Sequence, residues 1–186
     1  LGEQLAFLRQ PEPPGGWREA LELMPVLKSA LAMRPVTRSG KAPCQELVWR
    51  GDEIDLASPP VQTCWPGEPA PPITWPLVVT QGPGNAPEDS VNLGIYRMQV
   101  YDRNTTGMHW QTHKVGAHHQ RLAQEQKLER LEVAVALGAD PATMWAGSAP
   151  LPPDLDEYVL AGFIREEGVE LVKCVTVDLE VPAHAE

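Results

Sequence analysis

Hydrophobic residues recur at two different spacings along this chain, and the change of spacing divides it. Near the start, Trp17 and Leu21 stand at a helical interval, in a pattern that continues until Pro35 ends it. The stretch that follows, VTRSGKAP, has the composition of a linker. We therefore expect residues 1–41 to form a helical lead-in and linker, and residues 42–186 to form the main domain.

After Cys44 the spacing is typical of short strands. QELVW and DEIDL are strand candidates on either side of a turn. Nine prolines between residues 59 and 87 exclude a helix and most central strands. We expect a rigid loop that wraps a sheet, interrupted by ITWPLVVTQG as an edge strand, and we prefer this to a PxxP-type ligand motif.

The second half alternates strands with helices. NLGIYRMQVYD and MHWQTH flank the turn NTTG and predict a hairpin over residues 92–114. AHHQRLAQEQKLERL predicts a charged helix with His118 and His119 on its surface, and LEVAVAL predicts a buried strand. Asp140 and the proline after it predict a helix start. PPDLDEYVLAGFIRE predicts a further helix, and VELVKCVTVDLEV predicts one long closing strand.

These elements amount to about six to eight strands and three or four helices. They predict an α+β fold with a mostly antiparallel, barrel-like sheet. The formal net charge of −10 disfavours nucleic acid as a partner, and no apolar run reaches the roughly 20 residues that cross a bilayer. The three cysteines lie far apart without a CxxC pair, which favours a reduced, cytoplasmic protein over a disulfide or zinc framework.

Polar side chains with useful chemistry gather on the predicted hairpin, namely Asn92, Arg97, His109, His113 and Lys114. Two cations and two imidazoles could bind an anion such as phosphate. The alternative is that these are solvent-facing positions of a half-buried strand.

The spacing of Asn92 and Arg97 raises a geometric question. Five residues apart, they point to opposite faces of a regular strand unless a bulge at Gly94 brings them together. Glu157 lies near a helix start, where a solvated acid is also common. An amide, an imidazole and a carboxylate together suit magnesium or manganese better than zinc, but the spacing alone does not establish such a site.

Seven segments, in the same order, resemble the UbiD family of decarboxylases that act on aromatic and α,β-unsaturated acids. The segments are CQELVWRGDEIDL, PVQTCWPGE, ITWPLVVTQGP, NLGIYRMQVYDRNTTGMHWQTHKVGAHH, LEVAVALGADPAT, SAPLP and ELVKCVTVDLEVPAHAE. The resemblance implies a split antiparallel β-barrel of flavin-reductase type that binds prenylated FMN. It also implies manganese, with potassium nearby, bridging the cofactor phosphate to the protein.

The resemblance implies roles for individual residues. Asn92, His113 and Glu157 match the metal ligands, and Arg97 matches the catalytic arginine. Val115 departs from the acidic residue or glycine that the family commonly has there. The residues expected to contact the cofactor are Asn92, Ile95, Tyr96, Arg97, His109, Trp110, Gln111, His113 and Lys114.

Among the subgroups, the chain most resembles the 4-hydroxy-3-polyprenylbenzoate decarboxylases of ubiquinone synthesis. That resemblance implies an aromatic acid substrate, a flavin prenyltransferase as cofactor supplier, peripheral membrane contact for a polyprenyl substrate, and a homo-oligomer at full length. We expect this chain to be the cofactor-binding fragment, inactive without downstream acidic residues. The alternatives are a flavin-binding module without turnover and a structural domain without a ligand.

Overall fold

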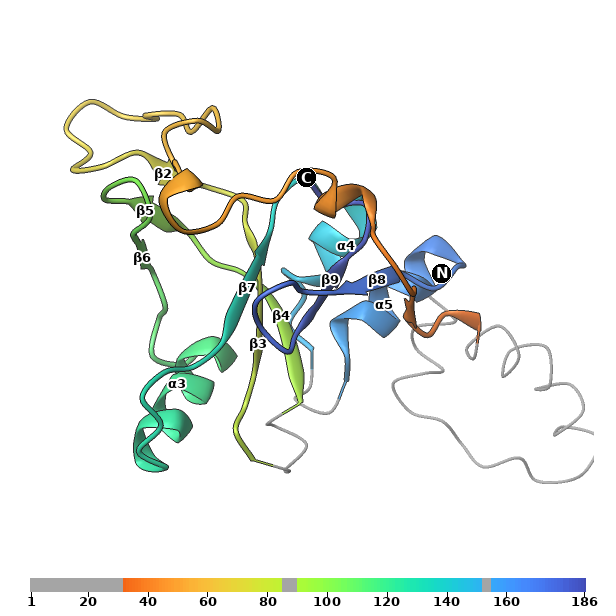
Figure 1. Cartoon of the computed structure of the whole chain (residues 1–186). Coiled ribbons are helices and arrows are strands. Elements are labelled where there is room, and N and C mark those ends of the chain that lie inside the picture. The colour runs from red at the N-terminus through yellow and green to blue at the C-terminus, as the bar shows by residue number, and fades with distance from the viewer. Residues whose placement is uncertain (1–31, 85–89, 152–154) are drawn as a thin grey trace, which may run out of the picture.

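The computed structural model describes residues 32–84, 90–151 and 155–186. Within these residues, nine strands form three sheets of three strands each, with the orders β4-β3-β7, β2-β5-β6 and β1-β8-β9. Three α-helices accompany them: α3 (Val115–Glu125), α4 (Pro141–Ala146) and α5 (Glu157–Arg165). Figure 1 shows α3 on one side of the sheet that contains β3, with α4 and α5 on the other.

The β4-β3-β7 sheet is the centre of the molecule. Strand β3 (Leu77–Gln81) pairs antiparallel with both β4 (Val91–Ile95) and β7 (Val133–Ala136). Because side chains alternate along a strand, the sheet has two distinct faces. Both faces of β3 are buried, so its apolar residues are nearly continuous instead of alternating with polar ones.

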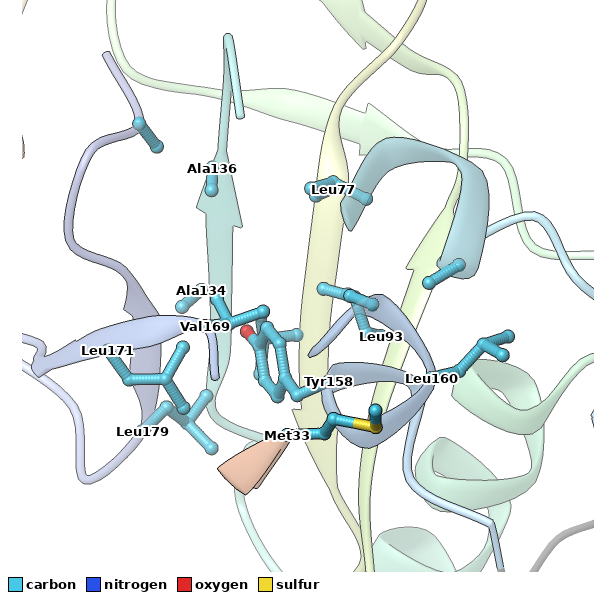
Figure 2. Close-up of a cluster of buried hydrophobic side chains, with 14 of the residues drawn as sticks. Met33, Leu77, Leu93, Ala134, Ala136, Tyr158, Leu160, Val169, Leu171 and Leu179 are labelled. Atoms are coloured by element: carbon cyan, nitrogen blue, oxygen red, sulfur yellow. The ribbon is translucent and has the colours of Figure 1, made fainter. Parts of the chain in front are cut away.

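One face of this sheet carries the main hydrophobic core. Leu77, Val79 and Leu93 point to it and pack against α4 and α5. Tyr158 of α5 lies at its centre, with only 2% of its surface exposed. Figure 2 shows the Tyr158 ring between Leu93 and Val169. This packing places the start of α5 beside β4.

The opposite face lies under α3. Val78 and Thr80 of β3 point to it, and Val78 clusters with Tyr96 and Met98. Helix α3 keeps Gly116, Ala117, His119 and Ala123 buried, while its other residues are charged or polar except for the half-buried Val115 and Leu122. The small residues allow a close approach of the helix to the sheet, as in amphipathic surface helices.

The other two sheets flank this centre. Strand β5 (Met98–Val100) pairs antiparallel with β2 (Pro72–Ile73) and β6 (Thr106–Met108). Strand β8 (Glu170–Lys173) pairs antiparallel with β9 (Glu180–Pro182) and parallel with β1 (Val36–Thr37). Figure 1 shows these two sheets at opposite ends of the molecule.

Several strand predictions are wrong. QELVW and DEIDL form no strand; 3-10 turns occupy η1 (Pro43–Gln45) and η2 (Gly51–Glu53) instead. The ITWPLVVTQG segment is not one edge strand: Ile73 belongs to the edge strand β2, and Leu77–Gln81 form the central strand β3. Pro76 precedes the paired residues of β3 and so removes no ladder hydrogen bond.

Two long predicted strands are each divided. NLGIYRMQVYD breaks after Ile95 into β4 and β5, which belong to different sheets. VELVKCVTVDLEV folds back on itself as the β8–β9 hairpin, with Cys174 N donating to Leu179 O at 2.8 Å. Alternation cannot reveal such breaks, since both halves keep the same period.

The helix predictions fare better. α5 lies within its predicted segment, and α4 begins at the predicted start, where Asp140 accepts hydrogen bonds from the N–H groups of Ala142 and Thr143 as an N-cap. α3 begins at Val115, before the predicted segment 117–131, and ends at Glu125. His119, however, is completely buried and not on the surface. The helices expected before residue 32 lie outside the described residues.

The α+β class with mostly antiparallel pairing is confirmed, although the described strands form separate sheets and no closed barrel. Strand β1 lies in the stretch expected to be a linker, and the boundary at residue 42 stays a prediction. In the parts of the chain that the structure describes, no helix combines the length and hydropathy needed to cross a membrane.

Candidate functional site

A cavity of about 310 Å³ opens beside β4, which is the edge strand of the central sheet. The first turns of α3 and α5 border it. Its lining residues are Ser90, Val91, Asn92, His113, Lys114, Val115, His118, Arg121, Leu151, Leu155 and Glu157. The three residues predicted as metal ligands therefore line one cavity.

Asn92 enters this site from β4. Its Cα partner on the central strand is Thr80, and only 6% of its surface is exposed. The Asn92 Nδ2 atom lies 3.5 Å from the hydroxyl of Tyr96, which also accepts from Gly116 N at 3.4 Å. This contact turns the amide nitrogen toward Tyr96 and leaves the amide oxygen available to a cation.

Glu157 enters from the first residue of α5. Asp156 caps the helix by accepting a hydrogen bond from Tyr158 N, and Glu157 Oε2 accepts one from Leu93 N at 3.1 Å. Burial raises the pKa of the Glu157 carboxyl to about 7, with the Leu93 hydrogen bond opposing the shift. Among the described residues, no Lys or Arg side chain forms a salt bridge with it.

His113 and Lys114 enter from the segment just before α3. Both are exposed to solvent, and Lys114 is the N-cap residue of the helix. Its side chain does not cap the helix, and the first turn carries no acidic residue. Gly116 N donates to Tyr96, but the positive end of the helix dipole still favours an anion at this position.

A second, smaller cavity of about 210 Å³ is lined by the other predicted residues except Trp110. Its lining consists of Ile95, Tyr96, Arg97, His109, Gln111 and Lys114. Arg97 follows the end of β4, and its carbonyl accepts a hydrogen bond from His109 N at 2.9 Å. Lys114 is the residue that both cavities share.

The predicted site is thus divided between two cavities. Asn92 and Arg97 point into different cavities, and no bulge at Gly94 unites them, because β3 and β4 pair continuously in register. Trp110 lines neither cavity. Its ring packs edge-on against Tyr96, with centroids 6.0 Å apart, and faces a third hollow at the far end of α3.

Two cationic or imidazole residues of the first cavity were missed by the sequence analysis. His118 and Arg121 follow Lys114 by four and seven residues, which places all three on one face of α3. That helical spacing was the signal available in the sequence. With them, the cavity gathers basic groups around a single acid in a chain whose net charge is −10.

The described residues contain no group of three or more His, Cys, Asp and Glu side chains placed to share a metal. The predicted ligand set has only two residues of these types, completed by the Asn92 amide. Amide oxygen, imidazole nitrogen and carboxylate oxygen suit a hard divalent cation, and no Lys or Arg of the described residues forms a salt bridge with the half-buried Glu157. The residues present therefore fit such an ion beside a phosphate.

Comparison with solved structures identifies similar folds. The UbiD-class enzyme HmfF from Pelotomaculum thermopropionicum, in complex with FMN, is 32% identical with a TM-score of 0.74, over 86% of this chain and 36% of that one. An evolved dimeric form of HmfF in complex with prFMN matches equally well. The 3,4-dihydroxybenzoic acid decarboxylase AroY from Klebsiella pneumoniae is 26% identical, with a TM-score of 0.73, over 90% of this chain and 36% of that one.

The chain therefore spans somewhat more than a third of the length of these relatives. A family model, described as the UbiD 3-octaprenyl-4-hydroxybenzoate carboxy-lyase Rift-related domain, matches residues 36–186. The order of the segments, the fold and this match agree, and the chain belongs to the UbiD family.

Proposed function

We propose that this chain is the cofactor-binding part of a UbiD-type carboxy-lyase, which removes carbon dioxide from an aromatic or α,β-unsaturated acid with prenylated FMN. One observation carries the proposal. Asn92, His113 and Glu157 line a single cavity, and Lys114 joins that cavity to the one containing Arg97. The HmfF structures with FMN and prFMN support a flavin as the ligand.

The larger cavity suits the phosphate end of the cofactor. Asn92, His113 and Glu157 would hold manganese, with potassium nearby, and Lys114 and the start of α3 would face the phosphate oxygens. A dianionic phosphate needs concentrated positive charge, which a divalent ion and a helix N-terminus both supply. The ion would also supply a counter-charge to the half-buried Glu157 carboxylate.

The smaller cavity suits the reacting end. Arg97 offers a planar guanidinium fork that matches a carboxylate with two hydrogen bonds. Ile95 and Tyr96 provide an apolar wall, and His109 and Gln111 complete the polar side. The modified flavin supplies the electron sink for loss of carbon dioxide, while the chain binds and orients the acid. Trp110 contributes through its packing on Tyr96.

The finer assignments extend the same proposal. The description of the matching family domain supports 4-hydroxy-3-polyprenylbenzoate as substrate. With that substrate we expect a role in ubiquinone synthesis and peripheral membrane contact. Three free cysteines accord with a cytoplasmic location, alongside a flavin prenyltransferase that supplies the cofactor. At full length we expect a homo-oligomer in which the flanking sheets complete a split barrel.

The test is to coexpress the chain, and the full-length product of its gene, with a flavin prenyltransferase in medium containing manganese. We expect both proteins to release a ligand with the absorbance and mass of prenylated FMN. We also expect the full-length protein, but not the chain alone, to release carbon dioxide from a panel of aromatic acids. Absence of any flavin would overturn the proposal, and flavin without turnover in the full-length protein would favour a binding module.

A further inference from the structure

A buried polar pair joins α3 to the central strand. His119 of α3 and Thr80 of β3 are both 0% exposed, and His119 Nδ1 lies 3.0 Å from Thr80 Oγ1. Which atom donates depends on the tautomer of the imidazole. Neither residue lines the two cavities or takes part in the proposed chemistry.

The pair is directly connected to the candidate metal site on both sides. Thr80 is the Cα partner of Asn92 across the β3–β4 ladder, so the two side chains share one face of the sheet. His119 lies just over one helical turn after Lys114, on the helix whose first residues follow His113. The hydrogen bond therefore spans the two elements that deliver Asn92 and His113 to the cavity.

We propose that His119 is a positioning residue, whose hydrogen bond to Thr80 sets the position of α3 over β4 and so the separation of Asn92 from His113 and Lys114. The identity of the bound metal and phosphate rests on the proposed function. The role of the hydrogen bond in attaching α3 to the sheet is independent of that function.

The hydrogen bond can set the position of α3 because hydrogen bonds are directional. The other buried residues of α3 are Gly116, Ala117 and Ala123, whose small side chains interlock less deeply than large ones. The hydrogen bond from Gly116 N to the Tyr96 hydroxyl is longer, at 3.4 Å, and holds only the start of the helix. A hydrogen bond has a narrow range of distance and angle, and breaking it here would take a hydrogen-bond partner from a buried polar group. The Thr80–His119 bond therefore sets the position of α3 over the central sheet.

The test compares two variants of Thr80 with a control variant and with a variant of His119. Thr80→Val keeps the shape of the side chain and removes the hydroxyl, whereas Thr80→Ser keeps the hydroxyl. Thr143→Val is the matched control, because it removes a buried hydroxyl that bonds Asp140 in α4, away from both cavities. His119→Asn is the conservative variant on the other side, since its amide can occupy the place of Nδ1.

Two measurements are made on each protein: Mn²⁺ affinity in the presence of FMN, from the paramagnetic resonance signal of free Mn²⁺, and hydrogen exchange of the α3 peptide. We expect T80V to weaken Mn²⁺ binding by about 10- to 100-fold, the range for groups that orient metal ligands, and to speed exchange in α3. T80S and H119N should retain most of the affinity. T143V should lose stability while keeping its affinity for Mn²⁺.

Equal Mn²⁺ affinity in T80V and the unmodified chain would overturn the proposal. If the unmodified chain binds no Mn²⁺, the proposed metal site fails separately, and hydrogen exchange then decides the positioning role. Faster exchange in α3 of T80V than of T143V would support that role, and equal exchange would refute it.

Discussion

The carboxylate of Glu157 accepts a hydrogen bond from the backbone N–H of Leu93, with 3.1 Å between nitrogen and oxygen. This contact ties the first residue of α5 to the outer edge of β4, immediately after Asn92. One carboxyl oxygen is thereby engaged by the protein, which leaves the other for a cation in the cavity. The same bond fixes the direction in which the carboxyl group faces.

Replacement of Glu157 by glutamine separates these two roles. Glu157→Gln keeps an oxygen that can accept from Leu93 N and removes the negative charge. We expect the free energy of unfolding to change by less than about 1 kcal/mol, while Mn²⁺ affinity falls more than about 10-fold. Isothermal titration with Mn²⁺ and FMN measures the affinity. Glu167→Gln, at an exposed position just after α5, should leave it unchanged.

Lys114 should contribute to binding the phosphate of the cofactor and much less to binding its flavin ring. Lys114→Ala removes the cation shared by the two cavities. We expect FMN affinity to fall about 10-fold, equivalent to roughly 1.4 kcal/mol, and riboflavin affinity to change much less. Fluorescence titration with both flavins makes the comparison. Lys173→Ala, on an exposed residue of β8, is the control, and an equal loss for both flavins would contradict the assignment.

Arg97 should act mainly on the carboxylate of the substrate. Arg97→Lys keeps the positive charge and loses the planar guanidinium fork. We therefore expect it to weaken binding of the acid, as Arg97→Ala does. We expect the alanine variant to weaken binding of a benzoate-type acid by about 10- to 100-fold, from the loss of a charge-assisted hydrogen bond. Affinity for FMN should fall by less. Flavin absorbance during titration with the acid measures the first affinity, and titration with FMN measures the second. An unchanged affinity for the acid in the lysine variant would be inconsistent with bidentate binding.

The cap of α4 should make stability depend on acidic pH. Burial alone would raise the pKa of the Asp140 carboxyl, but hydrogen bonds from Thr143 and the charge of Arg165, 2.7 Å away, outweigh it and hold the pKa below its ordinary value. The folded state therefore favours the ionised form. Its contribution is complete above the ordinary pKa and is lost as the pH falls through the lowered value.

We therefore expect the unmodified chain to be more stable than Asp140→Asn at pH 7 by up to about 1 kcal/mol, the range of partly exposed ion pairs. The difference should shrink as the pH falls below about 4, because Asp140 then becomes protonated and loses its charge. The asparagine variant caps the helix at every pH and does not change in this way. Urea unfolding at several pH values measures it. Asp178→Asn, on an exposed residue, should show no such trend.

Gly162 should be intolerant of any side chain. A Cβ atom at this position of α5 would lie 2.0 Å from the backbone oxygen of Met33, which cannot turn away as a side chain can. We expect Gly162→Ala to cost about 3 kcal/mol or more in the free energy of unfolding. Gly147→Ala is the matched control, because its nearest atom belongs to the flexible Leu77 side chain. Calorimetry compares the two, and equal stability would refute the argument.

The sequence by itself determined the class of fold and the positions of the described helices. Asp140 and the proline after it begin α4, and the glycine and alanine residues within α3 mark its buried face. These signals are local, since a cap or a helical period involves residues within a few positions of one another. The types of residue at the candidate site, an amide, imidazoles, cations and an acid, were readable in the same way.

Only the tertiary structure decided which of these residues share a cavity. The register of β4 on β3 places Asn92 beside the start of α3, and the docking of α5 brings Glu157 to the same edge. The break after Ile95 sends Arg97 into a second cavity, and the packing of α3 on the sheet buries His119 against Thr80, so that it is not a surface residue. Such relations depend on packing between segments far apart in the chain, where local propensity carries no information about register or contact.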